Sequence, residues 1–407
     1  MVSFAMVPIH IKYLQGIGFV RSKQDYSLFS RSSEVTGSFL LALVYVDDVL
    51  LTGTHEEEII FVKKGLDETF IIKDLGPMRY FLGLEVARNA DGILLNQRKY
   101  VLDILKDLNM EDCGEVLFPM ARGLKLSTQQ GEVLAQPDVY RRIVGRLLYL
   151  NLARPDISYS VQHLSQFPSE PRTPHLQAAI HVVKYLKGTI NVGLFYPSNS
   201  TLSIEAYSDA DSGQCAFTSR SLSGYCIFLG TSLVSWKTKK QKTVSKSTAE
   251  AEYRSMSYTT SEIVWLNNLL KELHVDVTIP IPLYYDNKAA EHIAHNPVFH
   301  ERTKHLDIDC HYVRDKLEEG LLLPQHVRST EQLADLMTKP LGGQQHRHLC
   351  CKLGMKNVDD SAQFFKLGLY ALMTVQLERR LWRVMHLVED IRTLHDCIST
   401  GKGIAAN

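Results

Sequence analysis

Two sets of acidic residues in this chain have types and spacings suited to metal-dependent chemistry. The first is Asp47-Asp48, an adjacent pair inside the apolar stretch LLALVYVDDVLLTG. The second is spread over the later half of the chain and consists of Asp209 in YSDAD, Glu252 in STAEAEYR, Asp286 in YYDN and Asp335 in QLADLMTK. Carboxylates held on buried elements repel one another and are costly to desolvate unless a cation neutralises them. Each set is therefore a candidate site for a divalent cation.

The residues around Asp47-Asp48 predict a β-hairpin. SFLLALVY and VLLTG have the composition of two strands, and the Asp pair lies at the tight turn between them. Asp is common in turns, so a purely structural turn is the alternative to a metal site. A membrane span is excluded here, because the apolar run is well short of the roughly 20 residues that a bilayer needs.

The second set depends on strands and one long helix. Asp209 and Asp286 each end a predicted strand, and sites in α/β sheets gather at strand ends, so we expect these two side chains to meet. With Tyr253 at 0° and about 100° per residue, Glu252 falls at about −100°, inside an apolar stripe, and Glu250 at about +60°, facing solvent. The stripe contains Met256, Ile263, Leu266 and Leu270. The alternatives are a salt bridge for Glu252 and an ordinary helical role for Asp335.

Converging carboxylates with few His or Cys residues favour hard cations, Mg²⁺ or Mn²⁺. Two such ions about 3.5–4 Å apart can activate water and stabilise the leaving oxygen of a phosphodiester. Five lysines lie just before the long helix. They belong either to a solvated loop or to a ridge that contacts phosphates, in which case nucleic acid should bind less tightly at high salt. These candidate nucleic-acid contacts are Lys237, Lys239, Lys240, Lys242 and Lys246.

Composition limits the classes of protein. The 407 residues suffice for two or three domains, and 45 Lys+Arg balance 45 Asp+Glu, so a nucleic-acid partner would be met by local basic patches. Seven Cys without CxxC spacing predict reduced intracellular thiols. HRHLCC, residues 346–351, lacks the paired spacing of a zinc site. We expect no signal peptide and no membrane segment.

Helices are predicted over 55–70 and within 138–190, where one helix has Thr173 as its N-cap. A strand-turn-strand-helix unit is predicted over 80–105. After 201, strands and helices alternate, which predicts an α/β arrangement with a final helix from Ser329. The predicted segments are 1–125, 126–200, 201–341 and a tail of 342–407. A 4-3 apolar spacing over 377–398 predicts an amphipathic helix, a candidate surface for self-association.

These motifs, in this order over residues 10–355, resemble the end of a copia-type LTR-retrotransposon polyprotein, a kind abundant in plant genomes. The resemblance implies an α/β and α+β chain: a truncated reverse transcriptase palm and thumb, then an RNase H-like mixed-sheet α/β domain. Asp47 and Asp48 match the family's polymerase turn. The RNase H carboxylates of the family match residue by residue at Asp209, Glu252, Asp286 and Asp335.

The resemblance implies a Mg²⁺-dependent ribonuclease H that cuts the RNA strand of RNA–DNA hybrids. Asp209 and Asp286 would ligate the metals, Glu252 would orient water, and Asp335 would hold the second metal. RNA–DNA hybrid and single-stranded nucleic acid are the implied partners, in cytoplasmic virus-like particles or the nucleus. The rival interpretations are a catalytically dead remnant that only binds nucleic acid and an unstable product without function.

The chain departs from the family at several positions. Only 46 residues precede Asp47, where the family has a much longer palm and fingers region with a further catalytic Asp, so no polymerase activity is expected. Ser212 replaces a usual Trp, and Glu291 replaces an apolar residue. His326 is the nearest candidate for the mobile His of cellular enzymes of this fold.

Overall fold

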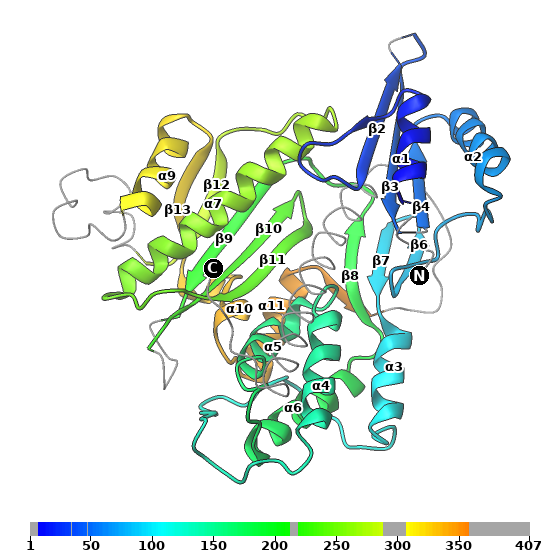
Figure 1. Ribbon diagram of the computed structural model, residues 1–407. Helices are drawn as coiled ribbons and strands as arrows, with labels where there is room; N and C mark the ends of the chain where they lie inside the picture. Colours follow the sequence, from blue (N-terminus) through cyan, green and yellow to red (C-terminus); the bar gives the residue numbers. More distant parts are fainter. Residues whose placement is uncertain (1–6, 34, 47, 212–218, 288–306, 358–407) are drawn as a thin grey trace, which may run out of the picture.

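The computed structural model describes residues 7–33, 35–46, 48–211, 219–287 and 307–357, and within these residues it contains three β-sheets (Figure 1). The expected mixture of α/β and α+β structure is confirmed. Glu291, Ser212 and the predicted helix at 377–398 lie outside the described residues. No helix in the described ranges is long and apolar enough to cross a membrane.

The first sheet is antiparallel and carries the predicted hairpin. Its order is β1 (Val20–Arg21), β2 (Leu28–Ser33), β3 (Ser38–Tyr45) and β4 (Asp48–Gly53). Tyr45 of β3 pairs with Asp48 of β4, so the predicted hairpin is confirmed, although Asp48 is the first residue of β4 and not a turn residue. Alternate residues of β3 point to opposite faces. Leu40, Ala42 and Val44 pack with α1 (Val7–Gly16) and α2 (Glu56–Phe70).

The second sheet joins distant parts of the chain. It has the order β14 (Met355–Asn357), β8 (Val192–Pro197), β7 (Gly92–Asn96), β6 (Leu84–Asn89) and β5 (Tyr80–Phe81). The hairpin β6–β7 is the strand-turn-strand predicted from the sequence. These strands come from three of the four predicted segments: β5, β6 and β7 from 1–125, β8 from 126–200 and β14 from 342–407. The predicted segment boundaries stay a prediction.

A helical unit packs below this sheet in the view of Figure 1. It consists of α3 (Arg98–Asp107), α4 (Pro137–Leu150), α5 (Ser158–Leu164) and α6 (Thr173–Lys187), whose apolar faces share one core. The predicted cap of α6 is wrong by one residue. Arg172 is the N-cap, and its backbone N–H donates to His175 Nδ1 at 3.0 Å.

The third sheet is mixed and has the order β11 (Ser232–Lys240), β10 (Leu222–Leu229), β9 (Ile204–Ala210), β12 (Ile281–Tyr285) and β13 (Leu322–His326). The strands β9, β10 and β11 are antiparallel, whereas β12 and β13 run parallel to β9. The long helix α7 (Thr248–Glu272) lies across one face of this sheet (Figure 1), and α9 (Asp307–Glu318) packs beside α7. On the other face, α10 (Asp335–Thr338) contacts β10 and β11 and is followed by α11 (Gly343–Lys352).

The first sheet also packs against the far half of α7. Leu41 and Leu43 of β3 share a core with the apolar residues of α7. Trp265 Nε1 donates to the Gln24 carbonyl at 3.1 Å, and Glu272 accepts a hydrogen bond from the Ser22 hydroxyl. Helix α7 is therefore covered on two sides, by its own sheet and by the hairpin sheet.

Candidate active site

Strand register brings two predicted carboxylates together. In the parallel pair β9–β12, Ala206 lies opposite Leu283 and Tyr207 opposite Tyr284. The same offset places Asp209, near the end of β9, beside Asp286, which follows β12. Asp335 begins α10, and oxygens of Asp209, Asp286 and Asp335 all lie within 4.8 Å of one another.

The segment before α10 sets the position of Asp335. The predicted continuous helix from Ser329 is wrong: a short 3-10 turn, Ser329–Glu331, is followed by an extended Gln332 and then by the four-residue α10. The fully buried Gln332 side chain donates to the Ser208 carbonyl at 3.0 Å and accepts from the Ala334 N–H at 3.1 Å. The local bond to Ala334 stabilises the extended Gln332 at the start of α10, and the tertiary bond to Ser208 fastens this segment to β9.

Glu252 reaches the site from α7. Glu252 is only 3% exposed, and the Ala210 N–H donates a hydrogen bond to its carboxylate. Its Oε2 has no hydrogen-bond partner among the described atoms, and no described Lys or Arg forms an ion pair with it. The alternative for Glu252 was a salt bridge, and the described residues do not form one.

Glu250 does not face solvent, so that expectation is wrong. It is 3% exposed, pairs with Arg254 at 2.8 Å and accepts from the Lys246 N–H at 2.7 Å. The predicted cap is present, because the Ser247 hydroxyl accepts from the Glu250 N–H at 3.1 Å. The helical periodicity could not show that the loop before α7 folds back over its first turn.

Lys339 and Thr338 were not identified from the sequence. Lys339 Nζ lies 3.2 Å from Asp209 Oδ1 and 2.5 Å from Asp335 Oδ1, and the Thr338 hydroxyl donates to Asp209 Oδ2. The Ser255 hydroxyl of α7 donates to the Asp209 carbonyl at 2.7 Å. The i, i+4 spacing of Asp335 and Lys339 was a signal that could have found the lysine.

Burial and like charge raise the pKa values of the carboxylates. Burial raises the pKa of Glu252 well above its ordinary value, and the charges of Asp209 and Asp286 add to the effect. Burial also raises the pKa of Asp209, although the Lys339 ammonium opposes this. For Asp335, burial followed by the charge of Asp209 raises the pKa to about 7. The site disfavours its own ionised form, which is the condition that a bound cation relieves.

The residues fit a divalent cation. Three carboxylates with oxygens this close, and no thiol or imidazole among them, form the donor set that hard cations prefer. The unpartnered Oε2 of buried Glu252 is a polar atom that otherwise lacks compensation. His326 lies at the rim, with Nε2 3.2 Å from the Asp286 carbonyl oxygen.

We predict that Asp335→Asn stabilises the protein at high pH in metal-free buffer. The pKa of Asp335 rises on folding to about 7, so its protonated form stabilises the folded state at low pH, and this contribution is lost as the pH rises through that value. The neutral amide avoids the loss. Relative to the parent, the variant should gain about 1–3 kcal/mol between pH 5 and pH 8, at about 1.4 kcal/mol per pKa unit. Thermal unfolding of the parent and the variant at pH 5 and pH 8 measures this gain. A stability difference between the two proteins that is the same at both pH values would contradict the prediction.

We predict that Gly224→Ala displaces α10. Gly224 pairs with Asp209, and a Cβ at this position would lie 2.6 Å from Met337 Cβ and from Thr338 Cγ2. Overpacking of this kind costs about 1–3 kcal/mol, which unfolding in denaturant would measure. Gly145→Ala is the matched control, because nothing lies within 4 Å of that added Cβ in α4. Equal effects of the two substitutions would refute the close packing of α10 on β10.

Asp48 of the hairpin is not part of this cluster. Asp48 is exposed at the start of β4, and Asp47 lies outside the described residues. Within the described ranges, the only group of three or more His, Cys, Asp or Glu side chains close enough to share a metal is Asp209, Asp286 and Asp335. A role for Asp47 and Asp48 in metal binding stays a prediction.

The structure places three of the five predicted lysines on the two faces of β11 and the other two in the loop that follows. Lys239 lies over the Tyr258 ring of α7, 4.9 Å from its centroid, and Lys237 shares that face by strand alternation. Lys240 points the other way and donates to Gln166 Oε1 at 2.7 Å. Lys242 and Lys246 are exposed in the following loop. A single ridge of all five is not formed.

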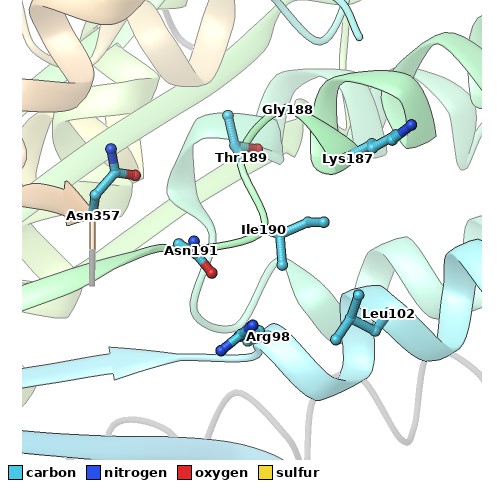
Figure 2. Close-up of a pocket in the computed structure, with 8 residues that line it drawn as sticks. All are labelled: Arg98, Leu102, Lys187, Gly188, Thr189, Ile190, Asn191 and Asn357. Carbon is cyan, nitrogen blue, oxygen red and sulfur yellow. The ribbon is translucent and has the colours of Figure 1, made fainter. Parts of the chain in front are cut away.

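A separate cavity of about 410 Å³ lies away from the carboxylates (Figure 2). It is lined by Arg98, Leu102, Lys187, Gly188, Thr189, Ile190, Asn191 and Asn357. None of these is a predicted site residue. Lys187 is engaged within the fold, since its Nζ donates to the Cys113 carbonyl at 2.6 Å.

Comparison with known proteins identifies the family. Residues 8–122 match the reverse transcriptase (RNA-dependent DNA polymerase) family. The chain is 44% identical over 349 residues to the retrovirus-related Pol polyprotein from transposon RE1 of Arabidopsis thaliana, covering 86% of this chain and 24% of that protein. It is 34% identical over 253 residues to a transposon Ty5-1 protein of Saccharomyces cerevisiae, covering 61% of this chain and 82% of that protein.

The N-terminal RNase H domain of a Mycobacterium tuberculosis protein, solved as a fusion with maltose-binding protein, is 12% identical and matches 37% of this chain and 98% of that chain with a TM-score of 0.24. The chain spans about a quarter of the length of the Arabidopsis relative. With relatives of 34–44% identity, one of them covered over most of its length, the chain belongs to the copia-type retrotransposon Pol family, and its residues 8–122 match the reverse transcriptase of that family.

Proposed function

We propose that this chain is a Mg²⁺-dependent ribonuclease H that hydrolyses the RNA strand of RNA–DNA hybrids. The observation that carries the proposal is the cluster of Asp209, Asp286 and Asp335, whose oxygens lie within 4.8 Å of one another at the ends of β9 and β12 and the start of α10. Glu252 adds a buried carboxylate with one unpartnered oxygen.

Each residue has a role in this proposal. Asp209, Asp286 and Asp335 would hold the ions, and Glu252, through its unpartnered Oε2, would orient the attacking water. When bound, two divalent ions supply an activated water and charge stabilisation for the leaving oxygen. Thr338 and Ser255 hold Asp209 in place from two different helices.

The proposed substrate is recognised by shape and charge. The 2′-hydroxyls and minor-groove shape of a hybrid would distinguish it from duplex DNA. Lys242 and Lys246, exposed in the loop before α7, would contact backbone phosphates, so binding should weaken with salt. The proposed place of action is the virus-like particle or the nucleus.

A labelled RNA–DNA hybrid incubated with the full chain tests the proposal. Cleavage of the RNA strand that requires Mg²⁺ and is abolished by chelation is expected, with duplex DNA of the same sequence left intact. Failure to cleave at any concentration of Mg²⁺ or Mn²⁺, by a chain that unfolds cooperatively, would contradict it.

A second candidate function is binding of hybrid or single-stranded nucleic acid without cleavage. The ion pairs of Lys339 with Asp209 and Asp335 favour it, because the ammonium uses oxygens that a metal would need. Salt-dependent binding in a filter or fluorescence assay, with no cleavage, would distinguish this function from the first.

A further inference from the structure

Lys339 is the one described cation that bridges the carboxylate cluster. Its Nζ lies 3.2 Å from Asp209 Oδ1 and 2.5 Å from Asp335 Oδ1. The Lys339 side chain is 31% exposed, whereas those of Asp209 and Asp335 are 1% and 6% exposed. The ammonium therefore reaches over the buried carboxylates from the solvent side.

Both oxygens of Asp209 are engaged by the end of α10. Lys339 takes Oδ1, and the Thr338 hydroxyl donates to Oδ2. Thr338 is 1% exposed and has a short side chain, so it can shift little. Lys339 carries its charge at the end of a flexible four-carbon stem that is already partly in solvent. Of the two contacts, the ammonium is the one that can leave.

An ammonium and a divalent cation are attracted by the same oxygens. With Asp209, Glu252, Asp286 and Asp335 ionised, the four negative charges and the one of Lys339 leave a net charge of −3. The ammonium lowers the attraction of the cluster for any further cation, and it physically occupies one oxygen each of Asp209 and Asp335. Those two residues belong to the set that could share a metal.

We propose that Lys339 is a built-in competitor for the divalent cation: it holds Asp209 and Asp335 through its ammonium, and metal binding requires that it be displaced. Lys339 thereby sets the metal affinity of the site. This inference rests on the proposed function for the identity of the site, but it concerns metal binding and not cleavage.

Calorimetric titration of Mn²⁺ into the full chain tests the role of Lys339. The variant Lys339→Met keeps the length of the stem and removes the charge, and it should bind Mn²⁺ roughly tenfold more tightly, because one competing charge is gone. Lys339→Arg should restore weak binding. Lys316→Met is the matched control, since Lys316 of α9 pairs with Glu319, just after that helix, and the Mn²⁺ affinity of this variant should equal that of the parent.

Equal or weaker Mn²⁺ binding by Lys339→Met, with a cooperative unfolding transition retained, would overturn the competition. Tighter binding by Lys339→Met and by Lys316→Met alike would also overturn it, because the effect would then reflect overall charge. The two proposals fail separately. Tighter binding without hybrid cleavage contradicts only the hydrolysis, whereas cleavage with unchanged Mn²⁺ affinity contradicts only the role of Lys339.

Discussion

Asp209→Asn should lower Mg²⁺-dependent cleavage of an RNA–DNA hybrid by at least about 10³-fold. Asp209 belongs to the cluster with Asp286 and Asp335, and its carboxylate contacts Lys339 and Thr338. An amide is a poor ligand for a hard cation, and metal catalysis is worth several kcal/mol at about 1.4 kcal/mol per tenfold in rate. Single-turnover cleavage of a labelled hybrid measures the effect.

The control for this substitution is Glu331→Gln, which removes an exposed carboxylate near the same segment and should leave cleavage unchanged. Loss of activity in Asp209→Asn should not come from unfolding, because burial raises the pKa of Asp209 and so favours a neutral side chain there. A variant that cleaves hybrid at the parent rate would end the assignment of this cluster as the active site.

Arg154→Met should destabilise the protein by about 3–5 kcal/mol, because it leaves a buried carboxylate without its partner. The side chains of Arg154 and Asp156 are 2% and 0% exposed, and Nη2 lies 2.7 Å from Oδ2. Burial would raise the pKa of Asp156, but the Arg154 charge and hydrogen bonds hold it below its ordinary value. The midpoint of denaturant unfolding should fall accordingly.

Arg142→Ala is the matched control for this prediction. Arg142 also pairs with an aspartate, Asp107, at 3.1 Å, but its side chain is 51% exposed, so its loss should cost at most about 1 kcal/mol. If Arg142→Ala and Arg154→Met have equal effects, the buried network is not what stabilises this region. Tyr185 and His346 also hydrogen-bond Asp156, so the network joins α6, the turn after α4 and α11.

Three of the candidate carboxylates could be anticipated because two local patterns determine their positions. Strand alternation ends at Asp209 and at Asp286, and parallel pairing of β9 with β12 then makes them neighbours. Helical periodicity placed Glu252 in the apolar stripe of α7, and Glu252 is buried there. Both patterns have a fixed repeat that a single sequence reveals.

The errors arose where tertiary contacts override a local pattern. Glu250 was expected in solvent but is buried by Arg254 and the backbone of Lys246. The final helix was expected from Ser329 but is interrupted at Gln332, whose side chain bonds to Ser208, 124 residues away. Periodicity describes one helix or strand at a time. It cannot reveal a loop or side chain from a distant part of the chain that packs against that element.

By itself, the sequence determined the hairpin at residues 38–53, the α/β alternation after residue 201 and the identity of four candidate carboxylates, since short-range repeats and motif order encode these features. The tertiary structure alone decided that β14 pairs with β8, that the hairpin sheet covers α7 and that Lys339 bridges Asp209 across 130 residues. Such contacts depend on which surfaces meet when the chain closes, and packing between residues far apart in sequence leaves no repeat to detect.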